Sequence, residues 1–222
     1  QPIGRALYPA LVQFGDQPAQ QFLAYRLATK VLLAIEVPAA LFLFLNADLV
    51  VQILGGVRYA DQADLLRLLA FAPLVDPLGR FGGELLVARN RDRDRILSLV
   101  LHLTALVAGG LYLAHRFGPV GMAWANFLAL GAPVLIWSLA RIDRPGLGRL
   151  VLDLVEVYGA PLPLFALAWW ASGDEAWLRF ALSALAALAS LAWFWWRFGG
   201  RFLEFFRAPR VADATPGTQP VE

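Results

Sequence analysis

Six long apolar stretches, separated by short polar breaks, constrain the fold of this chain more than any other feature of its sequence. They lie approximately at residues 27–54, 65–88, 96–114, 119–139, 150–171 and 177–196. A helix needs about 20 apolar residues to span the hydrocarbon core of a bilayer, and each stretch is close to that length or longer. The breaks contain Gly, Pro and charged residues, which end helices. The sequence therefore predicts an all-α fold, a polytopic membrane helix bundle with about six transmembrane helices.

Composition excludes most soluble classes of protein. Hydrophobic residues make up 59% of the 222 residues and charged residues 16%, whereas soluble domains average about 45–50% and about 25%. A water-soluble fold would leave large apolar patches exposed. The chain has no Cys and only two His, so thiolate metal sites are excluded and a typical zinc site is not expected. We predict no cofactor and no metal site, and the net charge of +2 gives no reason to expect a nucleic-acid partner.

Basic residues are distributed unevenly between the two sides of the predicted bundle. If successive connections alternate, one side receives residues 1–30, 89–95, 140–149 and 197–222. The other side receives residues 55–64, 115–118 and 172–176. The first group carries 14 Lys and Arg residues and the second carries two. Basic connections remain on the cytoplasmic side of a membrane, so both ends of this chain are predicted to be cytoplasmic.

The chain is expected to have three parts. Residues 1–26 would hold the end of a preceding helix and a cytoplasmic segment leading into the first span, and residues 27–196 would form the six-helix transmembrane lobe. Residues 197–207 alternate basic and aromatic side chains, which is typical of a segment lying on anionic lipid. The Pro-, Ala- and Thr-rich tail from Ala208 onwards is predicted to be a disordered cytoplasmic segment.

Charged residues within the predicted spans are the candidate functional residues, because charges at membrane depth are costly and usually face protein or water. Asp76, Arg80 and Glu84 follow one another at intervals of four along the second span, among several Pro and Gly residues. One interpretation is the wall of a polar cavity in which Arg80 binds a phosphate group and Asp76 and Glu84 contribute to substrate binding. The alternative is an internal ion pair that locks two helices together.

Two further acidic positions have open interpretations. Glu36 precedes Pro38 in the first span and is a candidate for coupling transport to protons. It also lies only a turn or two from the predicted start of that span, so its side chain could instead extend to the interface. Asp153 and Glu156 share one face near the start of the fifth span, and we expect them to face water or to pair with Arg149.

No enzyme signature is present in the sequence. It contains no Gly-x-Ser-x-Gly motif, no phosphate-binding loop and no His-Glu-x-x-His motif. We therefore predict no catalytic residues and no enzymatic activity.

The order of several short motifs resembles the C-terminal half of a polysaccharide (lipid-linked oligosaccharide) flippase of the multidrug/oligosaccharidyl-lipid/polysaccharide exporter superfamily. The resemblance covers about residues 1–141. The matching segments are Pro-Ala-Leu-Val at 9–12, Ala-Tyr-Arg at 24–26 followed by Pro38, Leu-Gly-Gly-Val-Arg-Tyr-Ala at 54–60, Leu-Leu-Arg-Leu-Leu-Ala at 65–70, Gly-Glu-Leu-Leu-Val-Ala-Arg-Asn-Arg at 83–91 and Gly-Pro-Val-Gly-Met-Ala at 118–123. Asn90 stands where relatives usually carry Gly, and Asn also tolerates a left-handed backbone.

The resemblance implies two six-helix lobes around a central cavity that alternate access by rocking. It implies that the partners are membrane lipids, a missing N-terminal lobe and a glycan linked to undecaprenyl pyrophosphate, which would cross the bacterial inner membrane. Because the chain begins with Gln1, we expect it to be a fragment. The alternative functions are a membrane subunit of a glycan polymerase or glycosyltransferase, which would be expected to show a large outer loop or a catalytic domain, and a structural assembly subunit.

Overall fold

The structure is a computed structural model that describes residues 8, 11–12, 14–15, 17–131 and 146–207. Every regular element in these parts of the chain is helical, which agrees with the predicted all-α class. The elements are α2 (Pro18–Leu45), α3 (Ala47–Gly55), the 3-10 helix η1 (Val57–Gln62), α4 (Ala63–Leu69), α5 (Ala72–Ala88), α6 (Asp92–Ala129), α8 (Leu147–Gly159), α9 (Leu162–Ser172) and α10 (Ala176–Arg207).

Four segments of the described chain are long and apolar enough to cross a membrane. They are Pro18–Leu45, Asp92–Ala129, Gly148–Ser172 and Ala176–Gly200. The chain therefore has the helices of a membrane protein. Six separate spans are not confirmed, because several predicted spans are interrupted or continuous with their neighbours. The predicted preceding helix, the end of the fourth span and the tail from Ala208 lie outside the described residues.

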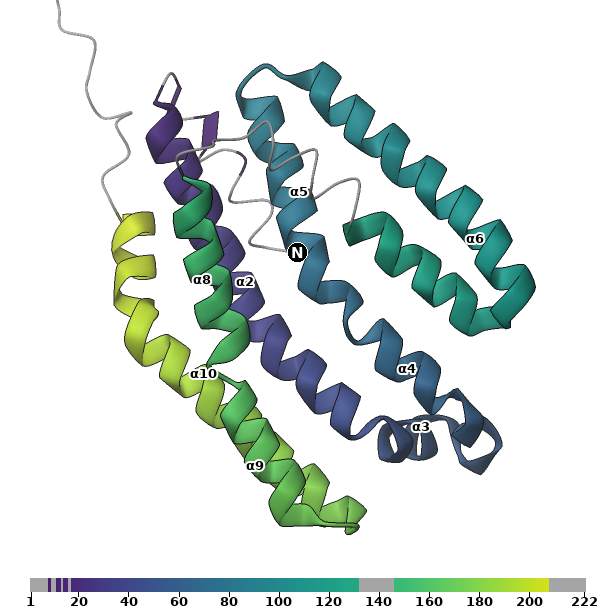
Figure 1. Cartoon of the computed structure of the whole chain (residues 1–222). Coiled ribbons are helices and arrows are strands. Elements are labelled where there is room, and N and C mark those ends of the chain that lie inside the picture. The colour runs from purple at the N-terminus through teal and green to yellow at the C-terminus, as the bar shows by residue number, and fades with distance from the viewer. Residues whose placement is uncertain (1–7, 9–10, 13, 16, 132–145, 208–222) are drawn as a thin grey trace, which may run out of the picture.

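Helix α2 lies at the centre of the bundle and packs against α5, α8 and α10 (Figure 1). It begins at Pro18 rather than at residue 27. Proline is well suited to the first turn of a helix, because the N–H that it lacks would have no hydrogen-bond partner within the helix at that position. Its neighbours bury Tyr25, Leu33 and Val37 almost completely. These residues belong to two apolar clusters that join α2 to α5, α8 and α10.

Asn46 ends α2 within the first predicted span. Its side-chain amide donates to the carbonyl of Phe42 at 2.8 Å and to Ser183 Oγ of α10 at 2.7 Å. These bonds satisfy the amide where the chain leaves one helix and begins the next, α3. The predicted polar end of the first span is therefore a separate short helix.

The second predicted span is divided into α4 and α5 at Ala70 and Phe71. Pro73 explains the break, because proline cannot donate to the carbonyl four residues earlier and its ring clashes with that turn. Pro77 adds a second interruption inside α5. The short helices α3 and α4 and the 3-10 helix between them form one end of the bundle (Figure 1).

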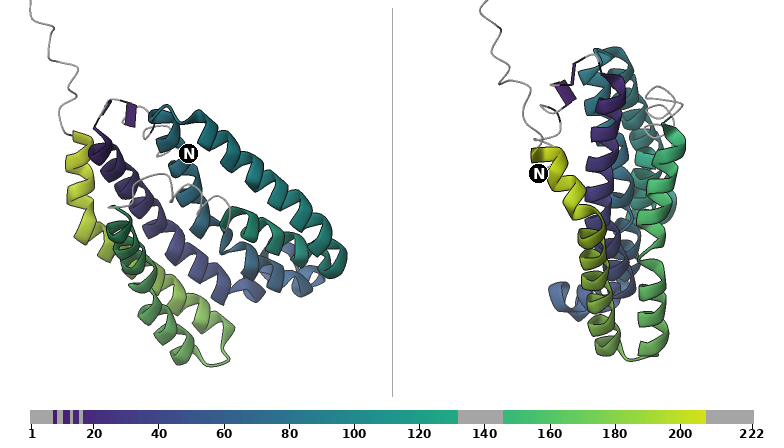
Figure 2. Two further views of the ribbon diagram at one scale, coloured as in Figure 1. Left: turned by 45° about the horizontal axis from the view of Figure 1, so that its top comes forward. Right: turned by 90° about the vertical axis from the view of Figure 1, so that its left-hand side faces the viewer.

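Helix α6 is a helical hairpin that contains the third predicted span and the described part of the fourth. Gly118 turns the chain with φ 61° and ψ −141°, a conformation that only glycine adopts readily. The two arms run antiparallel and pack against each other beyond this turn (Figure 2). His102 on one arm lies 3.1 Å from the carbonyl oxygen of Ala129 on the other. The predicted turn at residues 115–118 is thus confirmed, and the arms lie beside α4 and α5.

The last two predicted spans differ in continuity. The fifth comprises α8 and α9, which are separated around Pro161, whereas α10 continues without interruption to Arg207. Residues 197–207 therefore continue the last helix, and their predicted position on anionic lipid stays a prediction. Helices α9 and α10 form a hairpin through a turn at Gly173 (Figure 1).

The described basic segments gather at one end of the bundle. The start of α2, the connection between α5 and α6, the start of α8 and the end of α10 lie together (Figure 1). The η1 segment, the Gly118 turn and the Gly173 turn lie toward the other end. Asn90, in the α5–α6 connection, has a φ of 55°, in agreement with its expected left-handed backbone. The predicted cytoplasmic location of the basic end stays a prediction.

Candidate functional site

Two of the three predicted substrate-binding residues form an ion pair on a single helix. Arg80 pairs with Asp76 of the same face of α5, one turn earlier. Both side chains remain about one-third exposed, at 34% and 31%. The pair therefore does not join two helices. Glu84 has a different partner, because Arg95 of α6 lies 3.6 Å from it and links α5 to the hairpin.

Glu36 lies much deeper in its helix than the sequence suggested. Because α2 begins at Pro18, Glu36 is 18 residues, or about 27 Å, from the helix start. The expectation that its side chain extends to a nearby interface stays a prediction. One carboxylate oxygen of Glu36 is buried without a hydrogen-bond partner, and its charge interacts with that of Arg80. An acidic residue of α2 and a basic residue of α5 therefore influence each other electrostatically.

Two tyrosines hold the interrupted helix α5 in place beside these charges. Tyr25 of α2 donates to the carbonyl of Leu78 at 3.3 Å, and Tyr158 of α8 donates to the carbonyl of Leu74 at 2.6 Å. Both carbonyls flank Pro77. Membranes tolerate an interrupted helix where protein or a cavity covers the exposed backbone groups. The tyrosine hydroxyls therefore join α5 to α2 and α8 on either side of Pro77.

A second charged cluster, which we call the Arg26–Arg197 network, joins α2, α8 and α10. Its members are Arg26, Lys30, Asp153, Glu156 and Arg197. Arg26 Nε lies 2.9 Å from Asp153 Oδ2, and Lys30 Nζ lies 3.1 Å from Asp153 Oδ1 and 2.7 Å from Glu156 Oε2. Arg197 Nε completes the network at 2.9 Å from Glu156 Oε1. Three cations share two carboxylates, so the network carries a formal charge of +1.

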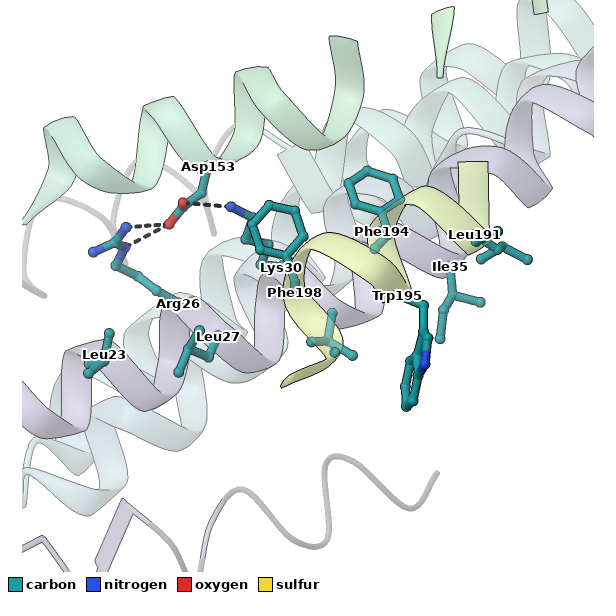
Figure 3. Close-up of a pocket in the computed structure, with 14 residues that line it drawn as sticks. Leu23, Arg26, Leu27, Lys30, Ile35, Asp153, Leu191, Phe194, Trp195 and Phe198 are labelled. Atoms are coloured by element: carbon teal, nitrogen blue, oxygen red, sulfur yellow. Dashed lines mark hydrogen bonds and ion pairs between the residues drawn. The ribbon is translucent and has the colours of Figure 1, made fainter. Parts of the chain in front are cut away.

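The network forms the polar end of a cavity of about 1060 Å³ (Figure 3). Arg26, Lys30 and Asp153 line that end, and the other lining residues are apolar or glycine. Leu23, Leu27 and Ile35 contribute one wall from α2, while Leu191, Trp195 and Phe198 contribute the other from α10. Lys30 Nζ lies 3.8 Å from the centre of the Phe198 ring, so α10 covers the ammonium group. The cavity is thus apolar along its walls and cationic at one end.

Sequence reasoning found only half of this network. Asp153 and Glu156 were expected to face water or to pair with Arg149, but their partners are Arg26, Lys30 and Arg197. Arg149 takes part only through its carbonyl oxygen, which accepts from Arg26 at 3.3 Å. A signal was present in the spacing, because Arg26 and Lys30 are four residues apart and Asp153 and Glu156 are three apart. A pair of basic residues on one helix and a pair of acidic residues on another predict an ion-pair network only if the two helices are known to be neighbours.

Neither cluster offers a typical metal site. Within the described residues there is no group of three or more His, Asp or Glu side chains placed to hold a metal ion. Both clusters instead combine guanidinium groups with carboxylates, which suits the binding of anionic groups and the exchange of ion-pair partners.

Replacing Asp153 with alanine should lower the stability of the folded bundle by about 3 kcal/mol. The substitution removes the carboxylate shared by Arg26 and Lys30, whose side chains are only 16% and 10% exposed. Unfolding of the purified protein in detergent, followed by circular dichroism, measures the loss. Arg67→Ala is the matched control, because Arg67 pairs with the exposed carboxylates of Asp48 and Asp64. This substitution should lower the stability of the fold by less than about 1 kcal/mol. Equal losses in the two variants would contradict a structural role for the network.

Comparison with known proteins identifies no relative of this chain. No protein-family model, curated protein or solved structure matches the chain. The resemblance to flippases therefore stays a prediction.

Proposed function

We propose that this chain forms part of a membrane transporter, a flippase that moves a lipid-linked oligosaccharide or polysaccharide precursor across the bacterial inner membrane. The supporting observation is the buried carboxylate oxygen of Glu36 on α2, which has no hydrogen-bond partner and is subject to the charge of Arg80 on the adjacent helix α5. Ionisable residues inside membrane segments are expensive and usually mark the pathway of an ion or a substrate. The substrate class comes from the sequence resemblance, in which undecaprenyl pyrophosphate carries the glycan.

The form of α5 supports transport rather than a purely structural role. Pro73 and Pro77 interrupt the helical hydrogen bonding immediately beside Asp76 and Arg80. Interrupted helices with exposed backbone groups recur at the midplane sites of transporters. Arg80 is one-third exposed and presents a planar set of donors suited to a phosphate group. On this proposal Arg80 binds the pyrophosphate, Asp76 and Glu84 position the cationic side chains, and Glu36 exchanges a proton during transport.

Repression of the gene in a bacterial host tests the proposal directly. A flippase defect should cause the carrier-linked glycan to accumulate on the cytoplasmic leaflet. Its location is measured by glycosidase digestion in sealed inside-out and right-side-out membrane vesicles, where only inside-out vesicles should yield cleaved glycan. A glycan polymerase subunit would instead leave short glycans accessible in right-side-out vesicles. That result, or unchanged glycan levels, would overturn the transport proposal.

A further inference from the structure

The cavity between α2 and α10 has the polarity of a lipid-binding site. Its polar residues lie at one end and its apolar residues continue along both helices (Figure 3). Several of the apolar residues are also open to the surroundings of the bundle, including Trp195 at 64%, Ile35 at 50% and Leu23 at 44% exposure. A lipid chain could therefore lie along the walls without first crossing the protein core.

The charge at the polar end matches one type of headgroup. The Arg26–Arg197 network has three cations and two carboxylates, which leaves one positive charge without a counter-charge inside the network. Partly buried unpaired charge is unfavourable and is relieved by a counter-ion. A phosphodiester carries one negative charge, whereas a pyrophosphate or a phosphate monoester carries more. The balance of charge therefore favours a phosphodiester.

The length of the cavity matches one leaflet of the membrane. The lining residues on α2 extend from Leu23 to Ile35, and those below Arg26 cover nine residues, or about 13 Å of helix. The hydrocarbon core of a bilayer is about 30 Å thick, so each leaflet contributes about half of this length. A headgroup bound at Arg26 would place its chain against the apolar walls as far as the bilayer midplane.

We propose that this cavity binds one anionic phospholipid from the adjacent leaflet. Its phosphodiester contacts Arg26, because Lys30 already faces Asp153, Glu156 and the Phe198 ring, and one of its acyl chains packs between α2 and α10. The bound lipid supplies the missing negative charge and thereby stabilises the contact of α10 with α2 and α8. The site is separate from Asp76 and Arg80 and does not depend on the proposed transport function.

Fluorescence quenching by brominated lipids tests the site, because Trp195 lines the cavity. The protein is reconstituted in phosphatidylcholine vesicles that contain an equal minor fraction of either brominated phosphatidylglycerol or brominated phosphatidylcholine. The signal of Trp195 is obtained by difference from a Trp195→Phe variant. A single positive charge near the membrane surface predicts about fivefold stronger quenching by the anionic lipid. Equal quenching by the two lipids would overturn the proposal.

Two variants separate the charge from the apolar wall. Arg26→Gln leaves Asp153 paired with Lys30 but reduces the network to zero charge, so the preference for the anionic lipid should disappear. Ala192→Phe keeps every charge and fills the cavity, and should reduce quenching by both lipids. Arg179→Gln on the same helix is the control and should retain the preference, because Arg179 bonds the carbonyl of Gly173 at the other end of α10. Circular dichroism confirms that each variant is folded.

Competition identifies the headgroup. Unlabelled phosphatidylglycerol should restore Trp195 fluorescence, whereas an equal fraction of an isoprenoid pyrophosphate should restore much less. The opposite order would overturn the phosphodiester assignment. A preference that survives in Arg26→Gln would show that the network does not bind the headgroup and would likewise overturn the proposal. Neither result affects the glycan experiment, so the two proposals can fail separately.

Discussion

Replacing Arg80 with alanine should abolish glycan export while the protein remains in the membrane. The substitution removes the guanidinium that pairs with Asp76 and interacts electrostatically with Glu36, so two carboxylates lose their cationic neighbour. An anionic substrate would then meet only negative charge at this position, and its entry would be opposed. Export is measured as glycan at the outer surface, and the amount of protein in the membrane is measured by immunoblotting.

Two further variants show whether charge or shape at Arg80 matters. Arg80→Lys keeps the positive charge but loses the planar donors that bind phosphate oxygens in pairs, so intermediate export is expected. Arg67→Ala removes another arginine of the same predicted span, but one paired with exposed carboxylates, and should leave export unchanged. Normal export by Arg80→Ala would contradict the assignment of this residue to the transport site. Loss of export in Arg67→Ala would show that the effect is not specific to Arg80.

Gly121→Ala should prevent the α6 hairpin from closing and lower stability by about 3 kcal/mol or more. A Cβ atom at Gly121 would lie 2.0 Å from the carbonyl oxygen of Leu113 on the opposite arm. That oxygen belongs to the backbone, so a side-chain rotation cannot relieve the clash and the arms must separate. The yield of monomeric protein in detergent and its resistance to thermal unfolding measure the effect.

Gly109→Ala is the matched control in the same hairpin. The new Cβ would meet the Cβ of Ala125 at 3.6 Å, which is an ordinary van der Waals contact. Alanine also has a higher helix propensity than glycine by about 1 kcal/mol, so this variant should be as stable as the parent or slightly more stable. If both variants lose stability equally, the close approach at Gly121 is not what holds the arms together.

The apolar stretches predicted the helical class because their length and composition are local properties of the chain. The turn at Gly118 and the left-handed Asn90 were also foreseeable, since each depends on a few neighbouring residues. The division of the second predicted span at Ala70 and Phe71 was less clear. Pro73 and Pro77 indicated an interruption, but the sequence alone does not say whether proline bends a membrane helix or ends it.

The charged residues were harder to interpret than the helices. Asp76, Arg80 and Glu84 were identified from their spacing on one helix, and the Asp76–Arg80 pair depends on that spacing alone. The Arg26–Arg197 network depends on which helices are neighbours, because its members come from α2, α8 and α10. Hydropathy identifies helices but does not indicate their order around the centre of a bundle. Lys30 was therefore counted only as a cytoplasmic charge.

The separation in sequence of these contacts sets an order of assembly. Within the α6 hairpin, Gly110 lies near Met122, and only a short segment of chain separates these two residues. The two arms can therefore associate as soon as both have been synthesised. Arg26 and Asp153 are 127 residues apart, and Arg197 follows later still. Until the ribosome has released α10, Glu156 lacks its second cationic partner, Arg197. The helices made earlier therefore remain in the bilayer with incomplete ion pairs until α10 is present. Completion of the Arg26–Arg197 network is thus a late step in the assembly of the bundle.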